Sequence, residues 1–222
     1  MKAKTIAFAC GMGLIGAGAV GNPAVAGHWY IAGQAGAVFL NSANFTANSP
    51  GGLSSPGATL HFDTGWGVGG SGGYGFDNGF RVEGEVTYRQ NGLNHATSPG
   101  GFSSPVSGHE SSWAFMANGY YDINTGSPWT PYVGGGIGLA LEQLSLNNVP
   151  VTFSSSTDFA YQGIAGIGYQ ITDAVNIAVE YRYFGTTGPS YGISGGPVPP
   201  GTTYDGSYGS NNIMLKLRWN LN

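Results

Sequence analysis

The feature that most constrains this chain is an alternation of apolar and polar side chains with a period of two residues. Residues 80–90 show it most clearly, because Phe80 and Val82 alternate there with Arg81 and Glu83. Successive side chains of a β-strand point to opposite faces, so this segment is predicted to be a strand with one apolar and one charged face. A soluble sheet buries its apolar face, whereas a transmembrane barrel turns that face to lipid and its polar face to the lumen.

The same alternation recurs along the chain and predicts eight strands, each about 10 residues long, as a tilted membrane strand requires. Their apolar phases consist of Trp29, Ile31, Ala35, Ala37 and Phe39; Trp66, Val68, Tyr74 and Phe76; Phe80, Val82, Gly84, Val86 and Tyr88; Trp113, Phe115 and Tyr121; Val133, Ile137, Leu139 and Leu141; Phe159, Tyr161, Ile167, Tyr169 and Ile171; Val175, Ile177, Val179, Tyr181 and Tyr183; and Ile213, Leu215, Leu217, Trp219 and Leu221. The pattern indicates an all-β fold, an eight-stranded antiparallel up-and-down transmembrane β-barrel.

Charge falls on only one phase of these strands, the phase opposite to the apolar one. This inward phase holds Arg81, Glu83, Glu85, Arg89, Glu180, Arg182, Lys216 and Arg218, together with the polar residues Gln34, Asn118 and Gln162. A soluble barrel carries charged side chains on its outer surface to stay in solution. The asymmetry therefore favours lipid outside and charge inside, with a soluble ligand-binding barrel as the weakest of three alternatives.

The first 26 residues have the pattern of a secretory signal peptide. Lys2 and Lys4 precede an apolar stretch, which leads to the A-x-A sequence that ends at Ala26. We expect cleavage after Ala26, so that residues 1–26 are removed and residues 27–222 form the barrel domain.

Composition excludes several classes of protein. The chain has one Cys, inside the expected signal peptide, so disulfide and thiol chemistry are absent from the mature form. Cleavage leaves five basic residues against 11 acidic ones, too few for a basic patch that binds nucleic acid. The 41 glycines have no period of three, which excludes collagen. Beyond residue 20 there is no run of about 20 apolar residues to form a transmembrane helix.

Short and long connections alternate between the predicted strands. Short turns are expected at Asp77-Asn78-Gly79, at residues 122–128 and at Thr172-Asp173-Ala174. Long segments rich in Gly, Ser, Asn and Pro are expected to be exposed loops over residues 41–59, 91–110, 142–157 and 185–210. Outer-membrane barrels have periplasmic turns and extracellular loops, so both termini are expected in the periplasm. Aromatic residues at the strand ends are expected to form two interfacial girdles.

Several segments resemble a known family. Residues 29–36 resemble the opening strand of OmpA-like barrels, and residues 116–122, 130–138 and 159–166 are similar to opacity-type proteins and rickettsial-type major surface antigens. The likeness spans essentially the whole mature chain. It implies an integral protein of the bacterial outer membrane that contacts lipid and lipopolysaccharide and is inserted by the barrel assembly machinery. The chain departs from the family at Trp219-Asn220-Leu221-Asn222, where such barrels usually end on Phe.

Two functions remain open for the lumen. An eight-stranded barrel encloses little more than its own side chains, so the inward charges either pair into a structural plug or line a narrow path. The main hypothesis is a structural, adhesive or antigenic role carried by the extracellular loops, which then contact host-surface or other extracellular ligands. The alternative is a narrow porin for small solutes or ions. The inward glycines leave room for long side chains or for a wet passage; they are Gly65, Gly67, Gly69, Gly134, Gly136, Gly166 and Gly168.

Neither the loops nor the histidines indicate an enzyme. The loop aromatics either form a recognition surface or pack onto the barrel rim; they are Phe45, Phe102, Phe153, Tyr191, Tyr204 and Tyr208. The four histidines, His28, His61, His95 and His109, lack metal-site spacing and are expected to be solvated, with haem or metal capture through His95 and His109 as the minor alternative. We therefore expect no catalytic residue, no cofactor and no metal.

Overall fold

The computed structural model describes residues 27–49, 53–147, 152–194 and 201–221. The expected signal peptide and its cleavage after Ala26 lie outside these residues. Every regular element within them is a β-strand. In this part of the chain, no helix has the length and apolar character needed to cross a membrane.

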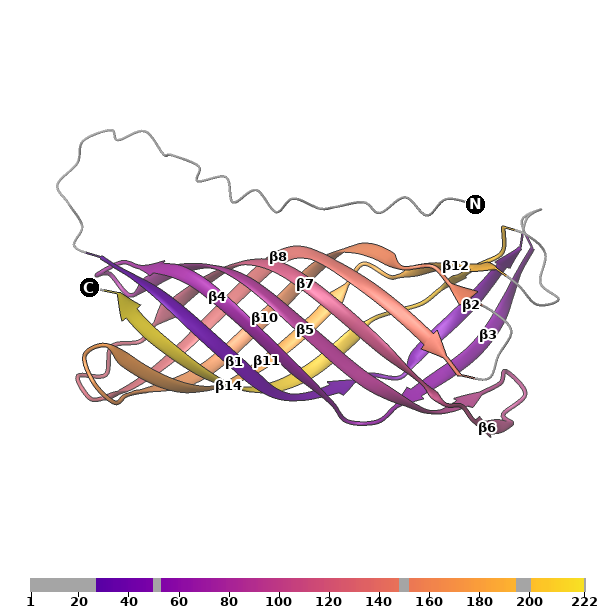
Figure 1. The fold of residues 1–222 in the computed structure, drawn as a ribbon, viewed down its shortest axis with the longest axis horizontal. Coiled ribbons are helices and arrows are strands. Elements are labelled where there is room, and N and C mark those ends of the chain that lie inside the picture. Colours follow the sequence, from indigo (N-terminus) through magenta and orange to yellow (C-terminus); the bar gives the residue numbers. More distant parts are fainter. Residues whose placement is uncertain (1–26, 50–52, 148–151, 195–200, 222) are drawn as a thin grey trace, which may run out of the picture.

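Eight strands close into an antiparallel barrel (Figure 1). They are β1 (His28–Leu40), β4 (Gly65–Gly75), β5 (Phe80–Thr97), β7 (Gly108–Asp122), β8 (Trp129–Leu146), β10 (Ser156–Gln170), β11 (Val175–Thr186) and β14 (Gly209–Leu221). Each barrel strand pairs with the next barrel strand along the chain, and β1 pairs with β14 to close the ring. This up-and-down topology confirms the predicted fold.

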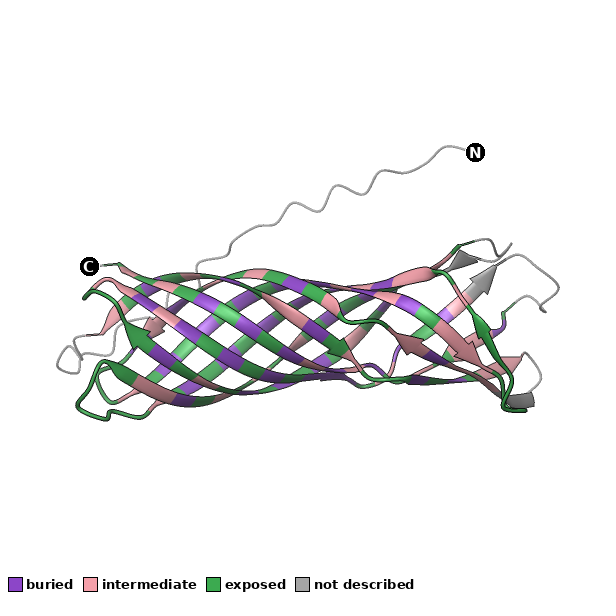
Figure 2. Ribbon diagram, turned by 90° about the horizontal axis from the view of Figure 1, so that it is seen from below, coloured by how far each residue is buried: buried purple, intermediate pink, exposed green. Residues whose placement is uncertain are grey.

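The period-two pattern of the sequence determines which face of each strand is buried. Outward apolar side chains are exposed, as for Trp29 at 64% and Leu215 at 54%, whereas the inward Arg182 and Glu180 are 1% and 0% exposed. Along the ribbon, exposed and buried residues alternate (Figure 2). Among the described residues of the eight barrel strands, no Asp, Glu, Lys or Arg occupies an outward position. An outer face without charge is suited to lipid.

The short turns form as predicted, and their sequences explain their geometry. Gly79 has φ +87° and Gly126 has φ +66°, a left-handed conformation that glycine adopts without a steric penalty. The Asn78 side chain accepts a hydrogen bond from the backbone N–H of Phe80, and Asn124 accepts one from Gly126. The Thr172 hydroxyl accepts a hydrogen bond from the N–H of Val175 in the third turn.

Aromatic side chains pack in pairs near both ends of the outer face. At the turn end, the pairs are Trp29–Tyr74, Phe80–Tyr121 and Trp129–Tyr169, with ring centroids 4.7–5.1 Å apart. At the other end, they are Trp66–Tyr88, Tyr88–Trp113 and Tyr161–Tyr183, at 5.0–6.4 Å. These two bands match the interfacial girdles of membrane barrels and mark the edges of the apolar face.

Beyond the second girdle, strands replace much of the predicted loop structure. The additional strands are β2 (Ala43–Ser49), β3 (Leu53–Phe62), β6 (Ser103–Pro105), β9 (Thr152–Phe153), β12 (Ser190–Ser194) and β13 (Thr203–Asp205). They continue from the barrel wall in the order β5-β3-β2-β13-β12-β9. The prediction of loops was wrong over these residues, because their Gly, Ser, Asn and Pro content concealed segments that pair as strands. On β2, the buried Ala43 and Phe45 still alternate with exposed residues. We call these strands, with the outer end of β5, the extracellular sheet, after the side of the membrane on which the sequence analysis predicts them.

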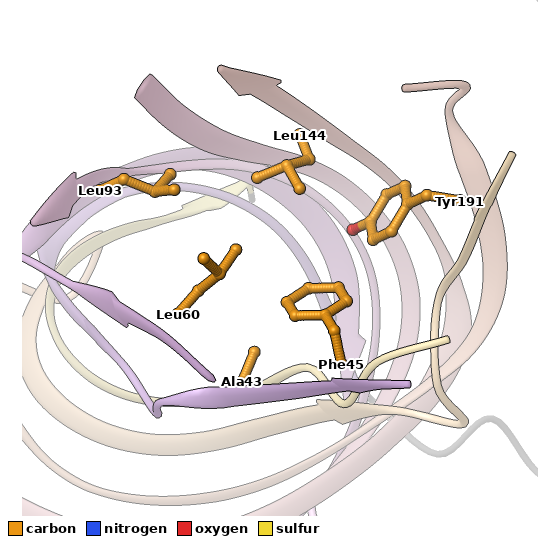
Figure 3. Close-up of a cluster of buried hydrophobic side chains, with 6 residues drawn as sticks. All are labelled: Ala43, Phe45, Leu60, Leu93, Leu144 and Tyr191. Carbon is orange, nitrogen blue, oxygen red and sulfur yellow. The ribbon is translucent and has the colours of Figure 1, made fainter. Parts of the chain in front are cut away.

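The extracellular sheet has its own apolar cluster over the mouth of the barrel. Six side chains converge there (Figure 3): Ala43, Phe45, Leu60, Leu93, Leu144 and Tyr191. They come from β2, β3, β5, β8 and β12, so the cluster ties the hairpins to the barrel wall. Phe45, Tyr191 and Tyr208 are at most 7% exposed and Tyr204 is partly buried, while Phe102 is 80% exposed. The side chain of Phe153 lies outside the described residues.

Candidate functional site: the polar lumen

The charged side chains of the barrel strands lie in the lumen. The structure brings together the side chains that the alternation assigns to the inward phase: Arg81, Glu83, Glu85, Arg89, Glu180, Arg182, Lys216 and Arg218, with Gln34, Asn118 and Gln162. All are at most 4% exposed except Arg218, which is partly buried near the turn end. Because inward positions come from every barrel strand, residues far apart in sequence meet across the axis.

Arg182 is at the centre of the network. Its Nη1 donates to both carboxylate oxygens of Glu85 at 2.8 Å, and its Nε donates to Glu180 at 2.7 Å. Its Nη2 donates to Glu180 and, at 2.6 Å, to the amide oxygen of Gln34. One guanidinium from β11 therefore connects side chains of β1 and β5 and uses its planar fork to neutralise two buried carboxylates.

A second centre forms around Glu83. Lys216 donates to the two oxygens of Glu83 at 2.9 and 2.8 Å, and its Nζ lies 3.7 Å from Glu180. The hydroxyls of Tyr30 and Tyr120 donate to Glu83 at 3.0 and 3.1 Å. Every lone-pair direction of this carboxylate is thereby used, which compensates for its removal from water.

Amide and hydroxyl groups complete the shell of Glu85. Thr87 donates to this carboxylate at 2.7 Å, and the amide nitrogen of Asn118 donates at 3.0 Å. Gln162 in turn donates to the oxygen of Asn118 at 2.7 Å. Because Asn118 receives from Gln162 and gives to Glu85, its amide orientation is determined by its neighbours.

At the turn end, Arg81 and Arg218 share one carboxylate. Arg81 binds Asp122 through two hydrogen bonds of 2.7 and 2.8 Å, whereas Nη1 of Arg218 lies 3.9 Å from Asp122. The guanidinium of Arg81 also stacks over the ring of Tyr120 at 4.5 Å. A cavity of only about 10 Å³ remains beside Arg81, Lys216 and Arg218, room for about one water molecule.

The part of the lumen that lies toward the extracellular sheet is arranged differently. Arg89 forms no ion pair among the described residues, and its guanidinium lies 4.1 Å from the ring of Phe184. Glu142 is fully buried and lies beside the hydroxyl of Thr186. Nη1 of Arg89 has no hydrogen-bond partner among the described residues, and the hydroxyl of Ser112 lies beside that of Tyr208. This polar segment is suited to ordered water, which satisfies such groups in protein interiors.

Glu110 lies above the membrane part of β7. A spanning strand needs about 9–11 residues, and counting back from Tyr121 places Glu110 beyond the girdle residue Trp113. Its carboxylate accepts a hydrogen bond from Tyr191 at 2.9 Å. Burial raises the pKa of Glu110 to about 7, because the charged form loses its hydration there.

Asp122, Glu110 and Glu142 are among the inward carboxylates that escaped the sequence prediction. Asp122 was assigned to a turn, and Glu110 and Glu142 to loops, yet all three lie on barrel strands. Each continues the phase of its strand, as Asp122 does after Asn118 and Tyr120. Extending the period of two past the apparent ends of the strands would have found them.

The histidines occupy positions that the sequence did not indicate. His61 on β3 lies directly opposite His95 on β5, whereas His109 on β7 lies opposite Gly92 and Ser145. The structure therefore pairs His95 with His61 and not with His109. Among the described residues, no group of three or more His, Cys, Asp or Glu side chains could hold a metal ion.

Comparison with known proteins agrees with this architecture. Residues 7–219 match the family described as outer membrane protein beta-barrel domain. The chain is 32% identical over 114 residues to outer membrane protein PagN of Salmonella typhimurium, a match that covers 47% of this chain and 48% of PagN. It is 34% identical over 127 residues to an outer membrane protein of Gluconacetobacter diazotrophicus, covering 51% of this chain and 33% of that protein. The matches thus span half or less of the length of these curated relatives.

Among solved structures, the fold is similar to that of outer membrane protein OprG from Pseudomonas aeruginosa. The TM-score is 0.67 at 14% sequence identity, covering 87% of this chain and 96% of OprG. A likeness at this identity establishes the fold alone. The family match over nearly the whole chain, the closed barrel and the uncharged outer face lead to one conclusion: the chain belongs to the outer membrane protein beta-barrel domain family and is located in the bacterial outer membrane.

Proposed function

We propose that this barrel is a non-conducting, non-enzymatic membrane anchor that presents the extracellular sheet as a surface for structural, adhesive or antigenic contacts. The observation that carries the proposal is the apolar cluster beneath that sheet, because strands that share a core form a preorganised surface. A preorganised surface loses less conformational entropy on binding than mobile loops do. We further propose that residues 1–26 are removed as a signal peptide, and that lipopolysaccharide and the barrel assembly machinery are the barrel's partners.

The filled lumen supports the non-conducting part of the proposal. At the turn end and in the centre of the lumen, four basic groups form ion pairs with four carboxylates: Arg81, Arg182, Lys216 and Arg218 with Glu83, Glu85, Glu180 and Asp122. Charges matched in this way leave little field to attract a permeating ion. Removing one partner would leave a buried charge unpaired, at a cost of about 3–5 kcal/mol. This cost opposes the opening of a conducting path through the lumen.

The test is conductance of the refolded protein in a planar bilayer. A shift in gel mobility between boiled and unboiled samples serves as the control for folding. We expect a folded and electrically silent barrel. Stable unitary currents would overturn the proposal and favour a narrow porin, and in that case R81E or R218E should change the ion selectivity of the currents.

A further inference from the structure

A buried carboxylate connects the barrel wall to the extracellular sheet. Glu110 of β7 is 4% exposed, and it accepts a hydrogen bond of 2.9 Å from the hydroxyl of Tyr191 on β12, which is fully buried. The ring of Tyr191 points into the apolar cluster over the barrel mouth (Figure 3). Because β7 is a barrel strand and β12 belongs to the extracellular sheet, this one contact ties β12 to the barrel wall.

The surroundings of Glu110 are poorly suited to a negative charge. Asn91 on β5 and Leu144 on β8 lie directly opposite it in the register. Leu144 is apolar, and the amide nitrogen of Asn91 donates to the backbone oxygens of Val38 and Asp63. Among the described residues, no Lys or Arg forms an ion pair with Glu110. One hydrogen bond from a neutral hydroxyl replaces only part of the hydration that an ionised carboxylate loses on burial.

The other titratable groups near Glu110 add to this effect. Around Glu110 and its neighbour Glu142 on β8, they are Tyr191 on β12, Arg89 on β5, Asp158 on β10 and Tyr208, which precedes β14. Three carboxylates therefore share one cation, whose guanidinium lies over the ring of Phe184. His109, next to Glu110 in sequence, points to the opposite face of β7. Burial and neighbouring carboxylates thus both oppose ionisation of Glu110, in agreement with its raised pKa.

Few backbone pairings hold the antiparallel strands β12 and β13, which we call the β12–β13 pair, to the rest of the extracellular sheet. β13 pairs with β2 over three residues, and β12 pairs with β9 over two. The β12–β13 pair is joined to β11 through Gly188, which has φ +112°, a conformation that favours glycine. Segments with so few pairings open locally at a lower free energy than long barrel strands do.

We propose that the contact between Glu110 and Tyr191 is a proton-dependent latch, which holds the β12–β13 pair over the barrel mouth while Glu110 is protonated and releases it when Glu110 ionises. Release lets water reach the carboxylate, so the open state favours its charged form and the closed state its neutral form. A rise in pH through the neutral range therefore shifts the equilibrium toward the open state. The latch does not depend on what the extracellular sheet binds.

The test is hydrogen exchange of the full barrel, refolded in detergent micelles and followed by mass spectrometry at pH 5 and pH 8. The readout is the protection factor of the peptide that contains residues 190–194, because this factor corrects for the intrinsic effect of pH on exchange. The equilibrium constant for opening should rise by at most about 70-fold between the two pH values, the limit set by a pKa of about 7 when closed and 4.5 when open. The membrane parts of β7 and β8 should stay protected at both pH values.

E110Q is the test variant, and D63N is the matched control, since it makes the same kind of change at an exposed carboxylate between β3 and β4. E110Q keeps an oxygen that accepts from Tyr191 and cannot ionise, so the protection of β12 should be the same at pH 5 and pH 8. D63N should behave as the native protein does. The gel-mobility shift on boiling establishes that each variant is folded.

A second variant tests the other half of the latch. Y191F keeps the ring in the apolar cluster but removes the hydroxyl, so the protection of β12 should fall already at pH 5. Equal protection of β12 at pH 5 and pH 8 in the folded native protein would overturn the proposal. A pH dependence that persists unchanged in E110Q would belong to a histidine or another carboxylate, and it would overturn the proposal equally.

Discussion

At the scale of single residues, the stability of the lumen network depends on how completely counter-ions and hydrogen bonds satisfy each buried charge. Arg182 uses three nitrogens on Glu85, Glu180 and Gln34 and so links two buried carboxylates through one guanidinium. Burial of two carboxylates is tolerated because this guanidinium and its neighbours replace their water.

Replacement of Arg182 should therefore destabilise the folded barrel strongly. R182M keeps a side chain of similar length but leaves Glu85 and Glu180 without their main counter-ion. We expect the free energy of unfolding to fall by about 3–5 kcal/mol, measured as the urea midpoint of the gel-mobility shift. The double variant R182M/E85Q should recover part of this loss, because one stranded charge is removed. An R182M midpoint equal to that of the native barrel would contradict the network.

The raised pKa of Glu110 predicts that the stability of the folded barrel depends on pH. Its pKa is about 7 in the folded protein and 4.5 as the ordinary value, so the folded state binds more protons between these values. Stability is therefore expected to decrease as the pH rises from about 4.5 to 7 and to stay low above that.

E110Q removes this titration while keeping an oxygen that accepts from Tyr191. At pH 8 the variant should be more stable than the native protein, by at most about 3 kcal/mol, and at pH 4 the two should coincide. Urea unfolding at both pH values measures the difference. Equal stability at pH 8 would mean that Glu110 is hydrated in the folded state.

At the scale of strands, the inward glycines allow neighbouring strands to approach one another closely. A Cβ at Gly138 on β8 would overlap the carbonyl oxygen of Phe115 on β7 and lie 2.9 Å from the Cα of Met116. Both are backbone atoms, which cannot move without disturbing the β7–β8 ladder. At Gly163 on β10, which faces outward, a Cβ would meet no atom within 4 Å.

The two glycines form a matched pair for mutation. G138A should lower the free energy of unfolding by about 1–3 kcal/mol, the usual cost of overpacking. G163A should leave it unchanged or raise it slightly, because alanine restricts the unfolded chain more than glycine does. The urea midpoints of the two variants provide the comparison. Equal effects would show that the steric contact at Gly138 relaxes without cost.

At the scale of the whole molecule, the sequence was sufficient to predict the barrel but insufficient to predict the strands at its outer end. The alternation around residues 80–90 identifies strands because lipid and lumen impose opposite polarity on the two faces. Above the membrane that contrast is lost, so Phe45 and Tyr191 could not be assigned from composition to a buried cluster. The pairing of His61 with His95 depends on the register of β3 against β5, which contains an irregularity after His61 and is invisible to a local pattern.

Closure of the ring has a consequence for the order in which the barrel forms. The seam joins β1 to β14 over twelve residue pairs, from Trp29 with Leu221 to Leu40 with Ser210, and every pair links the first barrel strand to the last one. Among the strand pairings of the described residues, this seam closes the longest stretch of chain and so has the largest cost in loop-closure entropy. Until β14 docks, the hydrogen-bonding groups of β1 and β11 are open to other strands, and lipid offers them no partner. We therefore expect unfolding to begin with opening of the β1–β14 seam, so that substitutions which weaken this seam should shorten the lifetime of the native barrel.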